Sequence, residues 1–233
     1  MRLAAVLLLA LALAAPAVAG ESISAARYDD PTTRYAHGVL GDAVEWGALT
    51  LDTSEGRRLR LVLPEERVFE DIAPRLADLD GDARADVIVV ESHRDFGARL
   101  AVYGLDGLVT ATDWIGRPNR WLAPIGAADL DGDGAMDIAF VDRPHLAKTV
   151  RVFSWRDATL TEVARAPGYS NHRIGEDFIS GGIRDCGGGP EMVVARGDWS
   201  GIVSLRWTGE GFAEAPLSDE TTPAAFAAAL ACS

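Results

Sequence analysis

The sequence is short of basic residues. It contains 22 lysines and arginines against 35 aspartates and glutamates, which gives a formal net charge of −13 at pH 7. A protein that binds nucleic acid needs a basic face to contact the phosphates. The composition therefore argues against nucleic acid as a partner.

Long apolar runs are also missing, apart from one at the start of the chain. Residues 3–14 are an unbroken run of leucine, alanine and valine, preceded by Met1-Arg2 and followed by Ala17-Val18-Ala19. The run is shorter than the about 20 residues that a spanning helix needs, and its flanks match a cleaved secretory signal. We predict a signal peptide over 1–19, cleaved near Ala19, and an exported, not membrane-spanning product in the periplasm or outside the cell. An uncleaved anchor is the alternative.

Cysteine occurs twice, at Cys186 and Cys232. In an oxidising compartment a lone pair of cysteines usually forms a bond, so we predict a disulfide here. Thr222-Pro223 followed by an alanine-rich run predicts a short helix over 222–232, which the bond would hold against the rest of the chain. Two unbonded thiols are the alternative.

Recognised catalytic signatures are absent from the sequence. There is no G-x-S-x-G elbow, no H-E-x-x-H, no C-x-x-C and no P-loop. Any enzymatic activity would therefore depend on groups that are far apart in the sequence.

Two nine-residue acidic segments, 78–86 and 129–137, are the most distinctive feature present. Acidic side chains occupy positions 1, 3, 5 and 9 of each segment. Closely spaced carboxylates repel one another unless a cation neutralises them, and Ca²⁺ takes about six to eight oxygen ligands. We predict two structural Ca²⁺ sites, in which Arg84 and Ala135 contribute their backbone carbonyls and the side-chain ligands are Asp78, Asp80, Asp82, Asp86, Asp129, Asp131, Asp133 and Asp137. A polar hairpin turn is the alternative. At position 6 of the first segment, Ala83 replaces the glycine that the second segment has there.

An EF-hand does not fit these segments. It requires a glutamate at position 12, where this chain has Val89 and Phe140, and short apolar runs of strand type follow each loop. The arrangement resembles the FG-GAP or VCBS repeats of integrin-α-type β-propellers. The resemblance implies calcium held between strands, and a secreted, calcium-stabilised β-propeller binding module for a protein or glycan partner.

The surrounding chain repeats with a period of about 50 residues, the size of a propeller blade. A third copy of the loop, 183–191, has lost most of its acids, and we interpret it as a calcium loop that has lost its metal. We predict an all-β fold, a small β-propeller-like array of four or five blades, with an open stack of the same units as the alternative. After the signal, one domain would cover 20–233, with repeats at roughly 34–65, 66–115, 118–166 and 170–216.

Polar residues open each repeat, where a propeller's strands line the central channel. His37, Arg120, His172, Arg173 and Glu176 are candidates for an acid–base cluster in a small exported hydrolase or lyase. Salt bridges in a wet channel are the alternative interpretation. A second set of polar loops, 91–94, 142–145 and 196–199, follows the main strands and is a candidate binding face. A structural, envelope-associated protein is the third functional hypothesis.

Overall fold

The computed structural model describes residues 20–233, so the predicted signal peptide at 1–19 lies outside the described residues. Regular structure is almost entirely β-strand, which confirms the all-β prediction. No helix of the described part of the chain is long and apolar enough to cross a membrane. The elements are β1 (Ile23–Thr32), β2 (Glu45–Thr53), β3 (Arg58–Val62), β4 (Arg67–Phe69), β5 (Arg75–Ala77), β6 (Asp86–His93), β7 (Gly97–Gly104), β8 (Gly107–Ala111), β9 (Leu122–Ala128), β10 (Asp137–Asp142), β11 (Thr149–Arg156), β12 (Thr159–Pro167), β13 (Tyr169–Ser170), β14 (Gly182–Asp185), β15 (Pro190–Arg196), β16 (Ile202–Trp207), β17 (Phe212–Ser218) and α1 (Pro223–Leu230).

The strands form four antiparallel units in chain order. The third unit is the simplest, because its sheet order β12-β11-β10-β9 pairs each strand with its neighbour in the chain. The second unit (β4–β8) and the fourth (β13–β17) follow the same order, but their first strand is split into two pieces that pair with the same partner. The first unit has β2 between β1 and β3, and one residue pair, Trp46 with Phe69, joins it to the second. This is the propeller-like array that the repeats predict.

The central strands of the second and third units are apolar on both faces because each of these two sheets lies between two others. In β6, Val87 and Val89 pack against the first unit, while Ile88 and Val90 pack against the third. Alternate side chains of a strand point to opposite faces, so an uninterrupted apolar run fills two cores at once. This explains why the strands after the acidic loops show no polar alternation.

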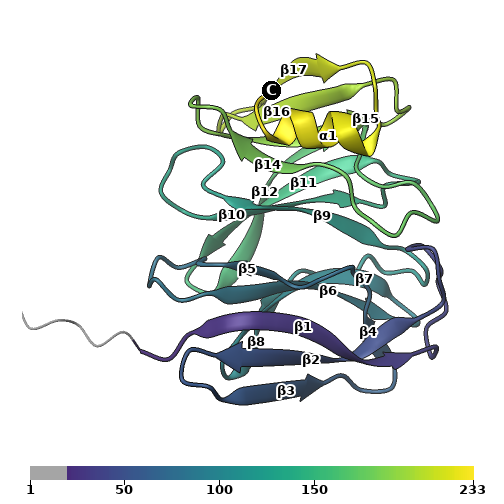
Figure 1. Ribbon diagram of the computed structural model, residues 1–233, viewed down its shortest axis with the longest axis vertical. Helices are drawn as coiled ribbons and strands as arrows, with labels where there is room; N and C mark the ends of the chain where they lie inside the picture. Colours follow the sequence, from purple (N-terminus) through teal and green to yellow (C-terminus); the bar gives the residue numbers. More distant parts are fainter. Residues whose placement is uncertain (1–19) are drawn as a thin grey trace, which may run out of the picture.

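The array is an open stack, the alternative arrangement to a ring. Figure 1 shows the sheets following one another from the first unit at one end to the fourth at the other. Within residues 20–233, no strand of the first unit pairs with one of the fourth. The helix α1 covers the outer face of the fourth sheet, where Phe226 packs against Val193 and Ile202. At the other end, the outer face of the first sheet carries ion pairs such as Asp52 with Arg27 at 2.6 Å. Neither end therefore exposes an apolar face, which is how repeat arrays terminate without closing.

Gly97 shows how tightly a neighbouring loop is packed onto the second sheet. Its φ of 71° lies in the left-handed region, and a Cβ there would lie 2.3 Å from Arg117 O and 2.7 Å from Arg120 O. Ala98 N also donates to Arg120 O at 2.7 Å. The backbone of residues 117–120 is therefore held in place by β7, and with it the base of the Arg120 side chain.

Candidate functional site

Both acidic loops occupy the same end of neighbouring units. Residues 78–86 connect β5 to β6, and residues 129–137 connect β9 to β10. In Figure 1 the two connections extend from the same side of the stack. The strand pairs that they join are equivalent, so the repeat in the sequence is also a repeat in space.

The two loops fold with the same hydrogen bonds. Asp78 accepts from Gly81 N at 2.8 Å and from Ala83 N at 2.9 Å, and the same two bonds of Asp129 measure 2.8 and 3.0 Å. The carboxylate at position 9 accepts from the amide at position 2, at 3.3 Å in the first loop and 3.1 Å in the second. Backbone amides thus hold the outer carboxylates, and the loop curls around the remaining acids.

Carboxylate oxygens converge inside each loop. One oxygen from each of three aspartates lies within 4.8 Å of the other two, and the sets are Asp78, Asp80 and Asp82, and Asp129, Asp131 and Asp137. An all-oxygen set with this spacing fits a hard cation such as Ca²⁺. Position 6 adopts a positive φ in both loops, 64° at Ala83 and 87° at Gly134. The first loop therefore carries backbone strain of about 1–2 kcal/mol that the second avoids.

Crowding of the acids changes their ionisation. Burial, reinforced by the charges of Asp131 and Asp133, raises the pKa of Asp137 to about 6. Burial, followed by the charges of Asp80, Asp82 and Asp78, also raises the pKa of Asp86. A cation in the loop would remove this repulsion, so each loop is destabilised at neutral pH without one.

We expect the pH dependence of the calcium-stripped protein to reflect Asp137. Its pKa in the folded protein, about 6, lies above the reference value of 3.8. Its contribution to stability is therefore fully present below the reference value and is lost as the pH rises through the folded value. Between pH 4.5 and 7 the unfolding midpoint of the wild type should fall by about 5 °C relative to Asp137→Asn. Thermal melts of the two proteins in calcium-free buffer measure this difference, and parallel pH profiles would contradict the expectation.

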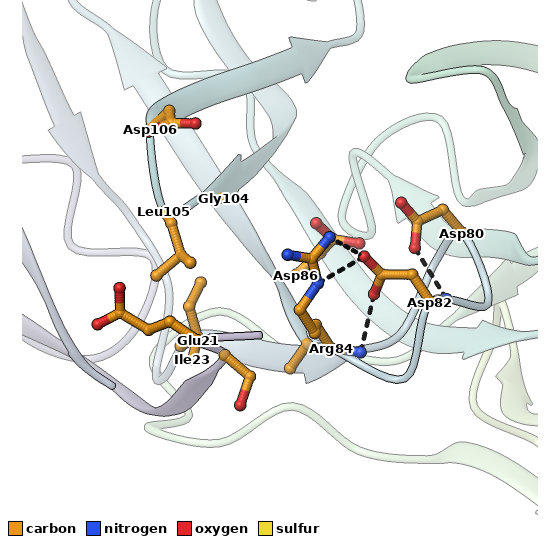
Figure 2. A pocket seen from close by; sticks show the side chains of 11 residues that line it. Glu21, Ile23, Asp80, Asp82, Arg84, Asp86, Gly104, Leu105 and Asp106 are labelled. Atoms are coloured by element: carbon orange, nitrogen blue, oxygen red, sulfur yellow. Dashed lines mark hydrogen bonds and ion pairs between the residues drawn. The ribbon is translucent and has the colours of Figure 1, made fainter. Parts of the chain in front are cut away.

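An arginine binds the position-5 aspartate in both loops. Figure 2 shows the Arg84 guanidinium against the Asp82 carboxylate, with Nε at 2.6 Å from Oδ2, and this contact lowers the pKa of Asp82. Arg156, from the end of β11, pairs with Asp133 in the second loop. The position-5 carboxylates are thus partly neutralised by the protein itself.

The third copy of the loop uses arginines and a disulfide where the other two gather carboxylates. Cys186 and Cys232 form a disulfide with a Cα–Cα distance of 5.7 Å, which confirms the predicted bond. The position-9 acid, Glu191, pairs with Arg184 at 2.7 Å and with Arg206 at 3.2 Å. Protein cations therefore neutralise this carboxylate. The bond ties the loop to the residue that follows α1 by two positions.

A cavity of about 240 Å³, here called the inner cavity, lies at the opposite ends of these strands. Asp142 pairs with Leu122, so the segment before β9 and the segment after β10 emerge side by side. A connection from the first unit and a turn from the fourth complete the lining. The lining residues are His37, Val39, Asn119, Arg120, Trp121, Arg143, Pro144, His145, Leu146 and Ile174. Segments from three units thus meet around one hollow.

A buried carboxylate orients His37. The His37 Nδ1 lies 2.5 Å from Oε1 of Glu70, whose other oxygen accepts from Ser92 Oγ. Glu70 is fully buried, and burial raises its pKa while the contact with His37 lowers it. With Nδ1 engaged by the carboxylate, Nε2 is the ring nitrogen left for other contacts.

The orientation of His145 depends on His172 behind it. His172 Nε2 lies 2.9 Å from Glu176 O, and a carbonyl only accepts, so this nitrogen carries the proton. In neutral His172, Nδ1 therefore accepts from Nε2 of His145, at 3.0 Å. Burial, with a smaller effect of His172, lowers the pKa of His145 to about 4. His145 is consequently neutral at pH 7, and its Nδ1 is an acceptor.

The two arginines of the cavity differ in their partners. Arg143 makes two bonds of 2.8 Å to the carboxylate of Asp142. Arg120 donates to Asn119 O at 2.9 Å, and no ion pair involves it in the described part of the chain. The cavity therefore contains one neutralised and one unneutralised guanidinium.

The other candidates from the sequence are oriented differently. Arg173 stacks on Trp199, with Cζ 3.8 Å from the ring centroid, and donates to Thr221 Oγ1 at 2.9 Å. Glu176 pairs with Arg173 at 3.4 Å. Of the five candidates, His37 and Arg120 line the inner cavity, and His172 lies directly behind its wall. Arg173 and Glu176 do not line it.

The residues of the second set of polar loops have different surroundings. Glu91 is buried and pairs with Arg67 and Arg99 at 3.0 and 2.9 Å, while Arg196 pairs with Glu214 at 2.6 Å. The loop 142–145 instead contributes Arg143 and His145 to the inner cavity. Sequence reasoning placed these residues in a different group from His37 and Arg120, and it assigned Glu70 no specific partner. The antiparallel register that joins them gives no sequence signal beyond the repeat itself.

One family model matches the part of the chain that contains the acidic loops. Residues 74–140, which include both acidic loops, match the family model of the FG-GAP-like repeat. No curated protein sequence matches the chain. Among solved structures, the crystal structure of the exotype rhamnogalacturonan lyase YesX is similar with a TM-score of 0.45 and 17% sequence identity. The match covers 82% of this chain and 41% of that one, so the chain spans less than half of its length.

Proposed function

We propose, from the match of residues 74–140 to the FG-GAP-like repeat, that the protein is an exported, calcium-stabilised binding module for a protein or glycan partner. The observation that carries the proposal is the repeated geometry of the acidic loops. Three carboxylate oxygens converge within 4.8 Å in each loop, on the same backbone framework. Calcium acts here through stability and not through chemistry.

Each ion would be held by the acids of one loop and a backbone carbonyl. In the first loop these are Asp78, Asp80, Asp82, Asp86 and the carbonyl of Arg84. In the second they are Asp129, Asp131, Asp133, Asp137 and the carbonyl of Ala135. Bound calcium would cross-link the two strands that enter and leave the loop, at the end of the sheet where backbone pairing stops.

Export is part of the same proposal. A disulfide such as Cys186–Cys232 persists in oxidising compartments, and extracellular calcium concentrations suit modest sites of this kind. We propose that residues 1–19 are a cleaved signal peptide and that 20–233 form a single domain in the periplasm or outside the cell.

Calcium stoichiometry tests the proposal directly. Equilibrium dialysis of the full chain should show two ions per molecule, and Asp131→Ala should leave one. The exposed Asp157 lines a hollow with Gly134 and Ala135 but makes no side-chain hydrogen bond or ion pair within residues 20–233, so Asp157→Asn is a matched control that should still bind two. Binding of no calcium by the wild type at millimolar concentration, or equal binding by all three proteins, would contradict the proposal.

A second candidate function, a small exported hydrolase or lyase, is favoured by one observation. His37 is held at 2.5 Å by the buried Glu70, beside Arg120 in the inner cavity. A histidine oriented by a carboxylate is suited to proton transfer. In this case His37 would be the acid–base group and Arg120 would bind charge on the substrate.

A further inference from the structure

The charge of the inner cavity is opposite to that of the protein. The chain has a net charge of −13, yet the lining contains Arg120, Arg143, His37 and His145 and no acid. Glu70 and Asp142, the acids that contact His37 and Arg143, lie behind the lining and are buried, and His145 is neutral. A locally positive hollow in an acidic protein concentrates anions.

Arg120 is unusual among the arginines of this protein. Over residues 20–233, every arginine except Arg117 and Arg120 takes part in an ion pair. Arg117 lies on the surface of the same loop and does not line the cavity, whereas Arg120 does. A planar guanidinium binds a carboxylate through two parallel hydrogen bonds, so the unpaired arginine inside the cavity is available to an anionic group.

The rest of the cavity is apolar. Of the large hydrophobic residues that are exposed in the described chain, Ile174 at 72% and Leu146 at 63% have the highest exposed fractions. Both line the cavity, together with Val39, Trp121 and Pro144. Exposed apolar side chains that gather around a concave site mark a surface that a ligand covers. An inorganic anion would leave them in water, while an organic anion would bury them.

We propose that the inner cavity binds a small organic carboxylate. The Arg120 guanidinium contacts the carboxylate group, and Leu146 and Ile174 cover the apolar body of the ligand. His37 and His145, each held by a partner behind the wall, keep the shape of the hollow before the ligand arrives. The site lies away from the acidic loops, so it goes beyond the calcium function and does not require it.

Binding of benzoate to the calcium-saturated full chain tests the proposal, with benzamide as its neutral isostere and inorganic phosphate as the compact anion. We expect saturable benzoate binding in an NMR titration and at least about tenfold weaker binding of benzamide. Arg120→Gln should weaken benzoate binding about tenfold, the effect of losing a charge-assisted hydrogen bond. Ile174→Ser should weaken it about threefold through lost apolar contact. The control Arg117→Gln should bind as the wild type does.

Several results would overturn the assignment. Equal binding of benzamide and benzoate would show that the negative charge of the ligand does not contribute to binding. Equal losses of benzoate affinity in Arg117→Gln and Arg120→Gln would show that only the net charge of the protein matters, and not the position of Arg120. Binding of phosphate without any carboxylate would refute the ligand class. Because Ile174 is exposed, its variant keeps the test valid if Arg120→Gln fails to fold. A failure of calcium binding in the dialysis experiment would leave the benzoate result standing, so the two proposals fail separately.

Discussion

Calcium-free protein is expected to unfold about 10 °C below the calcium-saturated protein. A ligand that binds only the folded state stabilises it by about 2.7 kcal/mol when its concentration is about 100 times its Kd. The two loops each gather three carboxylate oxygens within 4.8 Å, and the repulsion among them is lost when an ion binds. Thermal melts with millimolar calcium and with a chelator measure the difference.

Most of this dependence should disappear in Asp131→Ala. Asp131 belongs to the converging set of the second loop, which has the unstrained Gly134 where the first loop holds Ala83 at a positive φ of 64°. The matched control Asp157→Asn removes one nearby exposed charge and should keep the full calcium effect. If a chelator leaves the midpoint of the wild type unchanged, the calcium assignment is wrong.

Loss of the disulfide is expected to lower the free energy of unfolding by about 4 kcal/mol. The Cys186–Cys232 bond closes a segment with a sequence separation of 46, so breaking it restores the conformational freedom of that segment in the unfolded chain. The midpoint should fall by about 10 °C. The effect extends to the core, because the bond retains α1, whose Phe226 is 3% exposed against the fourth sheet.

The double variant Cys186→Ser, Cys232→Ser measures this effect in a calcium-saturated thermal melt. Reduction of the wild type should reproduce the midpoint of the variant, and a reductant should not change the variant itself. An unreduced wild type with both thiols open to alkylation, or a variant as stable as the wild type, would contradict the prediction.

The acidic loops were predictable because their geometry is local. Each places its carboxylates through bonds between residues no more than seven positions apart, such as Asp78 with Gly81 at 2.8 Å. A nine-residue pattern therefore contains most of what builds the loop. The disulfide was predictable for a different reason, since two cysteines allow a single pairing.

Other features escaped sequence reasoning because they depend on distant partners. The sequence of β1 shows only a weak alternation of charged and apolar residues. The strand forms because it pairs with β2, from which a long connection separates it in the chain. The inner cavity unites Arg120 with His145, and the link between them is the antiparallel register that pairs Asp142 with Leu122. Nothing in either segment alone indicates the other.

By itself, the sequence determined the repeating β-units, their acidic turns and the disulfide. The units and turns follow from short local patterns, and the disulfide follows because the chain has two cysteines. Tertiary structure alone decided that the stack stays open, since α1 and an ion-paired sheet face cover its two ends. It also decided that an unpaired arginine and two oriented histidines share one hollow. Packing and strand register bring together groups from three units. Such contacts depend on the whole fold and not on residues that are adjacent in the sequence.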